Sequence, residues 1–125
     1  MPTYCNVADS FSTTCGEAIT AGDAVSLHGD GLVYRANAAV GANQDIPAIG
    51  IAETTEILGG ELEVKRRGHV AEATGLTAGA WVYLGESDGA VTATAPSSAG
   101  DAVQVVGIAL SQTEYAIDLQ PETIV

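Results

Sequence analysis

The chain contains two copies of one sequence pattern, and this internal repeat constrains the fold more than any other feature. The first copy opens with Ile19-Thr20-Ala21-Gly22 and the second with Leu76-Thr77-Ala78-Gly79. Each opening leads into an apolar stretch, a turn rich in Gly and Asp, and a later apolar segment around Gly50 or Gly107. The two copies keep register, because Gly22 and Gly50 are as far apart in sequence as Gly79 and Gly107. Two copies are too few for a solenoid, so we expect a small pseudo-two-fold β-barrel or sandwich.

The hydrophobic pattern predicts an all-β fold of about eight strands, with no long helix. Most apolar residues are Ala, Val, Ile and Leu, which suit the narrow interior of a small β-barrel. Gly50 and Gly107 lie inside apolar strands, where a glycine indicates a bulge or a close approach of another backbone. The expected strands are Ile19–Leu27, Leu32–Ala36, Ala48–Ala52, Glu61–Arg67, Trp81–Leu84, Ala90–Thr94, Val103–Leu110 and Tyr115–Leu119.

The 125 residues are the length of a single domain. We interpret residues 1–16 as an extended N-terminal arm, because this segment is polar, rich in Ser and Thr and outside the repeat. Residues 17–125 then form one β-domain with repeats at about 17–70 and 74–121, joined by a linker at Gly68–Glu72. Such an arm either dangles or adds a strand to a partner's sheet, so its deletion is expected to leave the domain folded. Near the end of each copy, Leu62–Val64 aligns with Ile117–Leu119.

Charge excludes several classes of partner. The net charge of −12, from sixteen acidic and four basic residues, argues against binding to nucleic acid or to an anionic membrane surface. The sequence has no apolar run long enough for a membrane span, and residues 1–20 do not resemble a secretory signal, so we expect synthesis in the cytosol. The one basic cluster either balances nearby acidic side chains at a solvated strand end or contacts an acidic partner or a neighbouring subunit. It consists of Lys65, Arg66 and Arg67.

No group of residues indicates catalysis. His28 and His69 lie in a turn and in the linker, and neither is accompanied by a nucleophile and an orienting group at a known spacing. Cys5 and Cys15 are too few for a disulfide framework, which leaves two thiols or one bridge as the alternatives. We therefore predict no catalytic residue, no cofactor and no small-molecule substrate.

A metal site is not expected either. The histidines and cysteines follow no zinc-ligand spacing. Asp30, Glu86 and Asp88 lie in equivalent turns and could offer oxygen atoms to calcium, but they lack the pattern of a calcium-binding loop.

The second copy resembles the C-terminal half of the capsid cement, or head decoration, proteins of tailed bacteriophages, and the first copy resembles the other half more loosely. Together the resemblance covers about residues 17–121. It implies a barrel-like or tulip-like β-fold without enzymatic activity. The residues that carry it are Thr77, Ala78, Gly79, Val82, Tyr83, Leu84, Gly89, Thr92, Ala95, Pro96, Gly100, Asp101, Val103, Gln104, Val105, Val106, Gly107 and Pro121.

The resemblance also implies a location and partners. A protein of this family is made in the host cytoplasm and binds the outer surface of the expanded capsid in the virion, often as a homotrimer. Its partners would be the major capsid protein and copies of itself. The expected contact residues are Tyr4, Val7 and Phe11 in the arm and Lys65, Arg66 and Arg67 in the basic cluster.

Two other functions remain open at this point. Similar strings occur in phage tail and fibre proteins, so the chain could be a subunit of a tail, a fibre or a self-assembling tube. The other alternative is a carbohydrate-binding or ligand-binding β-module, in which Trp81 and Tyr83 would stack on sugars. Because Trp81 alternates with Val82 in a strand, we expect its side chain to be partly buried.

Overall fold

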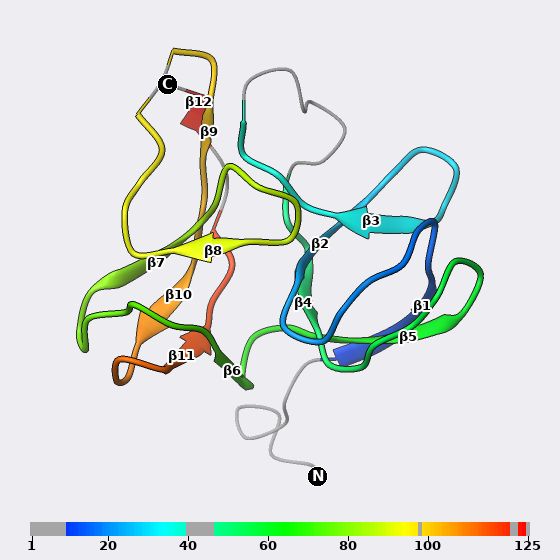
Figure 1. The fold of residues 1–125 in the computed structure, drawn as a ribbon, viewed down its shortest axis with the longest axis horizontal. Helices are drawn as coiled ribbons and strands as arrows, with labels where there is room; N and C mark the ends of the chain where they lie inside the picture. Colours follow the sequence, from blue (N-terminus) through cyan, green and yellow to red (C-terminus); the bar gives the residue numbers. More distant parts are fainter. Residues whose placement is uncertain (1–9, 40–46, 98, 121–122, 125) are drawn as a thin grey trace, which may run out of the picture.

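The computed structural model describes residues 10–39, 47–97, 99–120 and 123–124 and confirms the all-β class. These residues form two five-stranded antiparallel sheets and a two-stranded ladder, with no helix among them (Figure 1). The described part of the chain accordingly has no helix long and apolar enough to cross a membrane.

The first sheet has the strand order β1-β5-β4-β2-β3. The chain beyond β1 turns toward β3, where Cys15 forms an isolated bridge with Val33 and the Gly16 N–H donates to the Val33 carbonyl at 2.8 Å. The sheet therefore curls until its two edges meet at one end. Its strands are β1 (Ser10–Thr14), β2 (Ala24–Leu27), β3 (Val33–Arg35), β4 (Gly50–Ala52) and β5 (Glu61–Lys65).

The second sheet repeats this arrangement with the order β6-β11-β10-β7-β8. Each strand of this order corresponds to the strand at the same position in the first sheet, so β7 corresponds to β2 and β10 to β4. A separate ladder joins β9 (Ala102–Val103) to β12 (Thr123–Ile124). The strands of the second sheet are β6 (Val70–Glu72), β7 (Trp81–Leu84), β8 (Val91–Thr92), β10 (Val105–Ala109) and β11 (Glu114–Ile117).

The residue pairing repeats as well. In each sheet the central strand pair places a valine opposite the glycine that the two repeats share, and the next residue pair contains an isoleucine. The second sheet adds a bulge between Val105 and Gly107, which is the irregularity expected at a glycine inside a strand. The corresponding pairs are Val25–Gly50 with Val82–Gly107, and Ala24–Ile51 with Trp81–Ile108.

The predicted alignment of Leu62–Val64 with Ile117–Leu119 is wrong. Val64 pairs with Ala52, and Tyr115 pairs with Ala109 in the same position of the second sheet. Val64 therefore corresponds to Tyr115. The alignment failed because the loop between β4 and β5 spans residues 53–60, whereas the loop between β10 and β11 spans only residues 110–113.

The predicted boundary of the arm at residue 16 is also wrong. Ser10–Thr14 form β1 and pair along their whole length with β5, in the position that β6 occupies in the second sheet. The predicted linker contributes that strand, β6, so both sheets start with an edge strand that the sequence pattern did not reveal. β1 is hard to recognise because four of its five residues are polar, and β6 because it has only three residues. Residues 1–9 lie outside the described residues.

The buried apolar residues form two clusters. One lies within the first sheet and contains Cys15, Ile19, Val25, Val33, Ala52, Leu62 and Val64. The other joins the two repeats, because it combines the inner residues of the second sheet with Ala24 and Ile51 from the first. As a result, β2 and β4 are buried on both faces, one against their own core and one against the second repeat. The remaining members of the joint cluster are Ala36, Ala38, Ala48, Ala71, Leu76, Val82, Leu84, Ala102, Val106, Ala109, Tyr115 and Ile117.

The two repeated strand glycines mark close approaches, as the sequence predicted. A Cβ atom on Gly107 would lie 2.1 Å from the Ala116 carbonyl oxygen, and one on Gly50 would lie 2.3 Å from a methyl group of Val64. Both distances are shorter than van der Waals contact, so neither site has room for a side chain.

Candidate functional site

Of the predicted contact residues, the structure describes Phe11 on β1 and the basic cluster at the end of β5, the strand that pairs with β1. Tyr4 and Val7 lie outside the described residues. Phe11 is half-buried on β1 and packs against the core of the first sheet, so it contributes to the fold. The Lys65 ammonium group donates to the Val70 carbonyl at 3.1 Å, and Arg66 and Arg67 follow at the exposed end of β5. This basic cluster therefore lies where the chain passes from the first sheet to the second.

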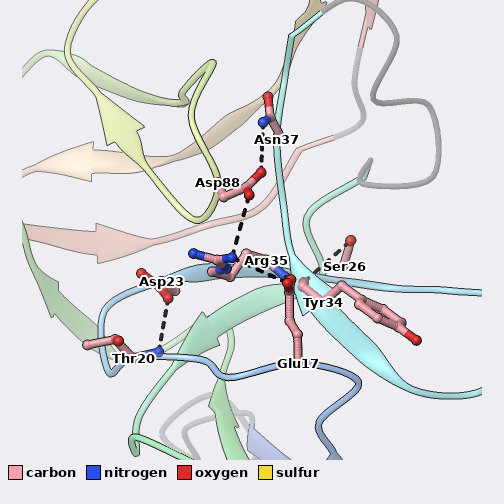
Figure 2. Close-up of polar contacts among 8 residues, drawn as sticks. All are labelled: Glu17, Thr20, Asp23, Ser26, Tyr34, Arg35, Asn37 and Asp88. Atoms are coloured by element: carbon pink, nitrogen blue, oxygen red, sulfur yellow. Dashed lines mark hydrogen bonds and ion pairs between the residues drawn. The ribbon is translucent and has the colours of Figure 1, made fainter. Parts of the chain in front are cut away.

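The main polar cluster connects the two repeats and is centred on Arg35, at the end of β3 (Figure 2). Its guanidinium Nη2 lies 3.3 Å from Glu17 Oε1 and 3.6 Å from Asp88 Oδ2. The second Glu17 oxygen accepts the Arg35 backbone N–H at 2.8 Å. Asp88 belongs to the turn between β7 and β8 and also accepts the Asn37 side-chain N–H at 2.9 Å. One basic side chain of the first repeat thus holds the turn of the second.

Backbone hydrogen bonds fix the same turn. The Ala24 N–H donates to the Gly89 carbonyl at 2.9 Å, and the Gly89 N–H donates to the Ala36 carbonyl at 2.8 Å. Gly89 has a φ of 75° and lies so close to Asp23 that a Cβ atom there would be 2.7 Å from the Asp23 carboxyl carbon. Only glycine satisfies both the conformation and the space at this position.

Asp23 is the ionisable group most affected by this contact. Burial raises its pKa above the ordinary value for aspartate, although the Thr20 N–H, at 3.0 Å, and the Arg35 charge act in the opposite direction. Burial of a carboxylate disfavours its charged form. The arrangement can therefore respond to pH, but it contains no nucleophile beside a base.

A second contact between the repeats uses the buried side chain of Gln104. Its oxygen accepts the Ala48 N–H at 2.7 Å, and its nitrogen donates to the Ala48 carbonyl at 3.0 Å. The amide therefore pairs with the Ala48 backbone as a neighbouring strand would. The sequence signal for this role was a single polar residue within the apolar stretch from Val103 to Leu110.

The remaining polar groups form local pairs. His28 stacks on the Tyr34 ring with 3.9 Å between ring centroids, and the Tyr34 hydroxyl donates to Asp30 at 2.6 Å, which lowers the pKa of Asp30. A hydrogen bond with Asp101 raises the pKa of Glu86. Asp30 and Asp88 are thus engaged separately, and within the described ranges no three His, Cys, Asp or Glu side chains are placed to hold a metal ion.

One cleft of about 380 Å³ lies between the two sheets, against β4, β5 and β6. Its lining includes the carboxylates of Glu53, Glu72 and Glu114, the Lys65 side chain and the apolar residues Ile51 and Val70. None of the residues that line it is Ser, Thr, Cys or His. The polar side chains that it offers are therefore carboxylates and one ammonium group.

Cys15 is a free thiol that is fully buried, and burial raises its pKa. Such a cysteine behaves as a small apolar residue, because the reactive thiolate is disfavoured. Cys5 lies outside the described residues.

Fold and site define a β-protein in which two equivalent sheets are joined by the Arg35 cluster and by the buried amide of Gln104. No protein-family model matches the sequence, and no curated protein matches it either.

Proposed function

We propose that the chain is a non-enzymatic structural protein of a virion, a decoration or cement protein that binds the outer surface of a phage-like capsid and stabilises it. It acts there as a homotrimer beside the major capsid protein. The observation that carries the proposal is the string from Leu76 to Pro121, which resembles such proteins over the whole second repeat.

Two features of the molecule support a role in assembly. The polar side chains of Arg35, Asp88 and Gln104 form contacts between the repeats. Several large apolar side chains, in contrast, lie on the surface. Surface apolar residues that group together are typical of sites where proteins associate. The exposed large apolar residues are Leu27, Ile57, Leu58, Val70, Trp81, Ile108 and Leu110.

The proposal is tested by adding the purified protein to expanded capsids that lack decoration. We expect saturable binding and a rise in the temperature or internal pressure at which the capsids rupture, because many weak contacts act together on a shell. An Arg66→Glu/Arg67→Glu variant tests the basic cluster, and Glu61→Lys is the matched charge change elsewhere on β5. Absence of saturable binding to any undecorated capsid would refute the proposal.

The second candidate is a subunit of a tail, fibre or tube. The observation that favours it is that exposed apolar residues lie on the β4–β5 loop and on β7 and β10, elements that Figure 1 shows toward opposite ends of the long axis of the molecule. Negative-stain electron microscopy of the isolated protein separates the two functions, because filaments or tubes favour this candidate and small closed oligomers favour the decoration protein.

A further inference from the structure

The outer face of the second sheet carries an apolar row that crosses four strands. Trp81 on β7 faces Ile108 on β10, Ile108 faces Ala116 on β11, and Ala116 faces Val70 on β6. Trp81, Val70 and Ile108 are 51%, 46% and 36% exposed. We name these four residues the outer row.

The equivalent row of the first sheet shows how such a face is used in this protein. Ala24 faces Ile51, Ile51 faces Lys65, and Lys65 faces Ser10. Ala24 and Ile51, which correspond to Trp81 and Ile108, have no exposed surface because the second repeat covers them. The second sheet has Trp81 in place of Ala24 and keeps an isoleucine, Ile108, in place of Ile51. No part of the described chain covers Trp81 or Ile108 in this way, since both remain partly exposed.

A second apolar feature lies on the loop between β4 and β5, which the second repeat lacks. Ile57 and Leu58 at its tip are 75% and 66% exposed. We name these two residues the loop tip. Figure 1 shows the chain that leads into β5 toward one end of the long axis, and β7 and β10 toward the other.

Backbone hydrogen bonds hold this loop in place on both sides of its tip. Ile19 and Glu56 exchange two hydrogen bonds of 2.9 Å. Gly59 donates to the Cys15 carbonyl, and Cys15 donates to the Gly60 carbonyl, again at 2.9 Å. The exposed tip is therefore fixed before any partner binds, so association would not have to order it.

We propose that the outer row is an interface between copies of this chain, and that the loop tip of one copy packs on the outer row of the next. In the first sheet, the equivalent face is covered by the second repeat, which belongs to the same chain. The loop tip is an exposed apolar projection toward the other end of the molecule. Such a contact joins two different surfaces, so it leaves one of each free on a dimer. Contacts of this kind form a ring if the rotation closes and a filament if it does not.

The test measures the oligomeric state of the purified chain by sedimentation velocity over a dilution series. We expect the parent to associate. Trp81→Asp in the outer row and Ile57→Asp/Leu58→Asp in the loop tip should each raise the dissociation constant by about tenfold or more. Leu27→Asp is the matched control, since Leu27 is 53% exposed and belongs to neither surface. It should associate like the parent.

Mixing the two variants tests the pairing of the surfaces. Each variant keeps one intact surface, so an equal mixture should form dimers and nothing larger, although each variant alone is monomeric. Circular dichroism verifies that the variants are folded, and Trp81→Thr replaces Trp81→Asp if the charged variant unfolds.

Three outcomes would overturn the inference: a parent that stays monomeric at every concentration, an outer-row variant that associates like the parent, or a loop-tip variant that associates like the parent. The measurement contains no capsid. Failure of capsid binding and failure of this interface are therefore observed separately.

Discussion

The two repeats share strand order and register, yet their outer faces differ. In the first sheet β2 and β4 are buried on both sides, whereas the equivalent β7 and β10 bury one side and expose Trp81 and Ile108 on the other. Side-chain size at one position explains much of this contrast. Ala24 is small enough for the Gly89 backbone to approach and accept its N–H, and the indole of Trp81 would occupy the corresponding space. Equivalent backbones therefore make different contacts because a few side chains decide what can approach them.

The repeats also differ in how their interiors are completed. The first sheet brings its edges together through Cys15 and Val33 and encloses a cluster of its own residues. The interior of the second sheet is continuous with Ala24, Ile51 and other residues of the first. The second repeat thus depends on the first for part of its core. Each prediction below would break or sharpen this comparison.

The largest effect is expected from removing residues 1–16. This truncation deletes β1 and the buried Cys15, so the first sheet loses an edge strand and its core loses one side. We expect the cooperative melting transition, measured by circular dichroism, to be lost. Removing only residues 1–9 eliminates none of the described contacts and should leave the transition in place. A folded domain after the longer truncation would show that β1 is dispensable, as in an appended arm.

The next effect compares the two strand glycines. Gly107→Ala places a Cβ atom against the Ala116 backbone and should cost about 3 kcal/mol or more, since backbone cannot move aside easily. Gly50→Ala first meets a Val64 methyl group, and the Lys65 carbonyl oxygen lies farther away at 2.8 Å, so its cost should be smaller and only partly relieved by Val64→Ala. Chemical denaturation measures both. Gly29→Ala is the control, because no atom lies within 4 Å of a Cβ there. Equal losses at Gly50 and Gly107 would contradict the distinction.

Gln104 tests the connection between the repeats. Gln104→Leu removes the hydrogen-bonding partners of both the Ala48 N–H and the Ala48 carbonyl group, which are buried. It should destabilise the protein by about 2–3 kcal/mol. Gln112→Leu, at an exposed position of the short β10–β11 loop, is the matched control and should have little effect. If both variants unfold at the same denaturant concentration as the parent, the amide does not hold the repeats together.

The sequence predicted the all-β class, the repeat and the tight glycine positions, because these leave local signals: alternation of apolar residues, turn residues and glycines inside strands. It did not predict β1, which is mainly polar, or β6, which has only three residues; each becomes recognisable as a strand by pairing with β5 or β11. The alignment of β5 with β11 failed because an inserted loop shifts the register without changing the local pattern.

The polar cluster that joins the two repeats was still harder to predict from sequence. Arg35, Asp88 and Glu17 are distant in the chain, and nothing local to any of them indicates the others. Trp81 was expected to be partly buried and is 51% exposed, because alternation in a strand identifies a face but not what covers it. Both depend on how the two sheets pack, which is a property of the assembled fold.

A smaller effect is expected from the ionisation of Asp23. Its folded-state pKa is raised, so the ionised carboxylate costs stability at neutral pH, and this cost disappears as the pH falls through the folded-state pKa. The raised pKa of Glu86 acts in the same direction, and the lowered pKa of Asp30 opposes it only in stronger acid.

The melting temperature of the parent should therefore rise as the pH is lowered from neutral toward the ordinary pKa of a carboxyl group, and Asp23→Asn should reduce that rise. Glu61→Gln removes one negative charge from an exposed position and serves as the control for overall charge. An Asp23→Asn variant with the same pH dependence as the parent would mean that the ionised Asp23 carboxylate does not oppose folding.

The smallest effect is expected from removing the hydroxyl group of Tyr115, a residue at which the repeats differ in what fills the space beside the strand glycine. The Tyr115 ring packs over Gly107 as Val64 packs over Gly50. Burial raises the pKa of Tyr115, and its hydroxyl has no hydrogen-bonding partner among the described residues. Because an unpaired buried hydroxyl costs free energy, Tyr115→Phe should leave the stability unchanged or raise it by up to about 1 kcal/mol.

Tyr115→Val, which copies the residue of the first repeat, separates the ring from its hydroxyl. It should destabilise the protein by about 2–4 kcal/mol, since the second sheet encloses a larger space than valine can fill. Denaturation of the two variants side by side measures the difference. A loss with Tyr115→Phe would reveal a partner for the hydroxyl, and no loss with Tyr115→Val would mean that the second repeat can contract to the dimensions of the first. The second result would show that the difference between the two interiors is smaller than their side chains indicate.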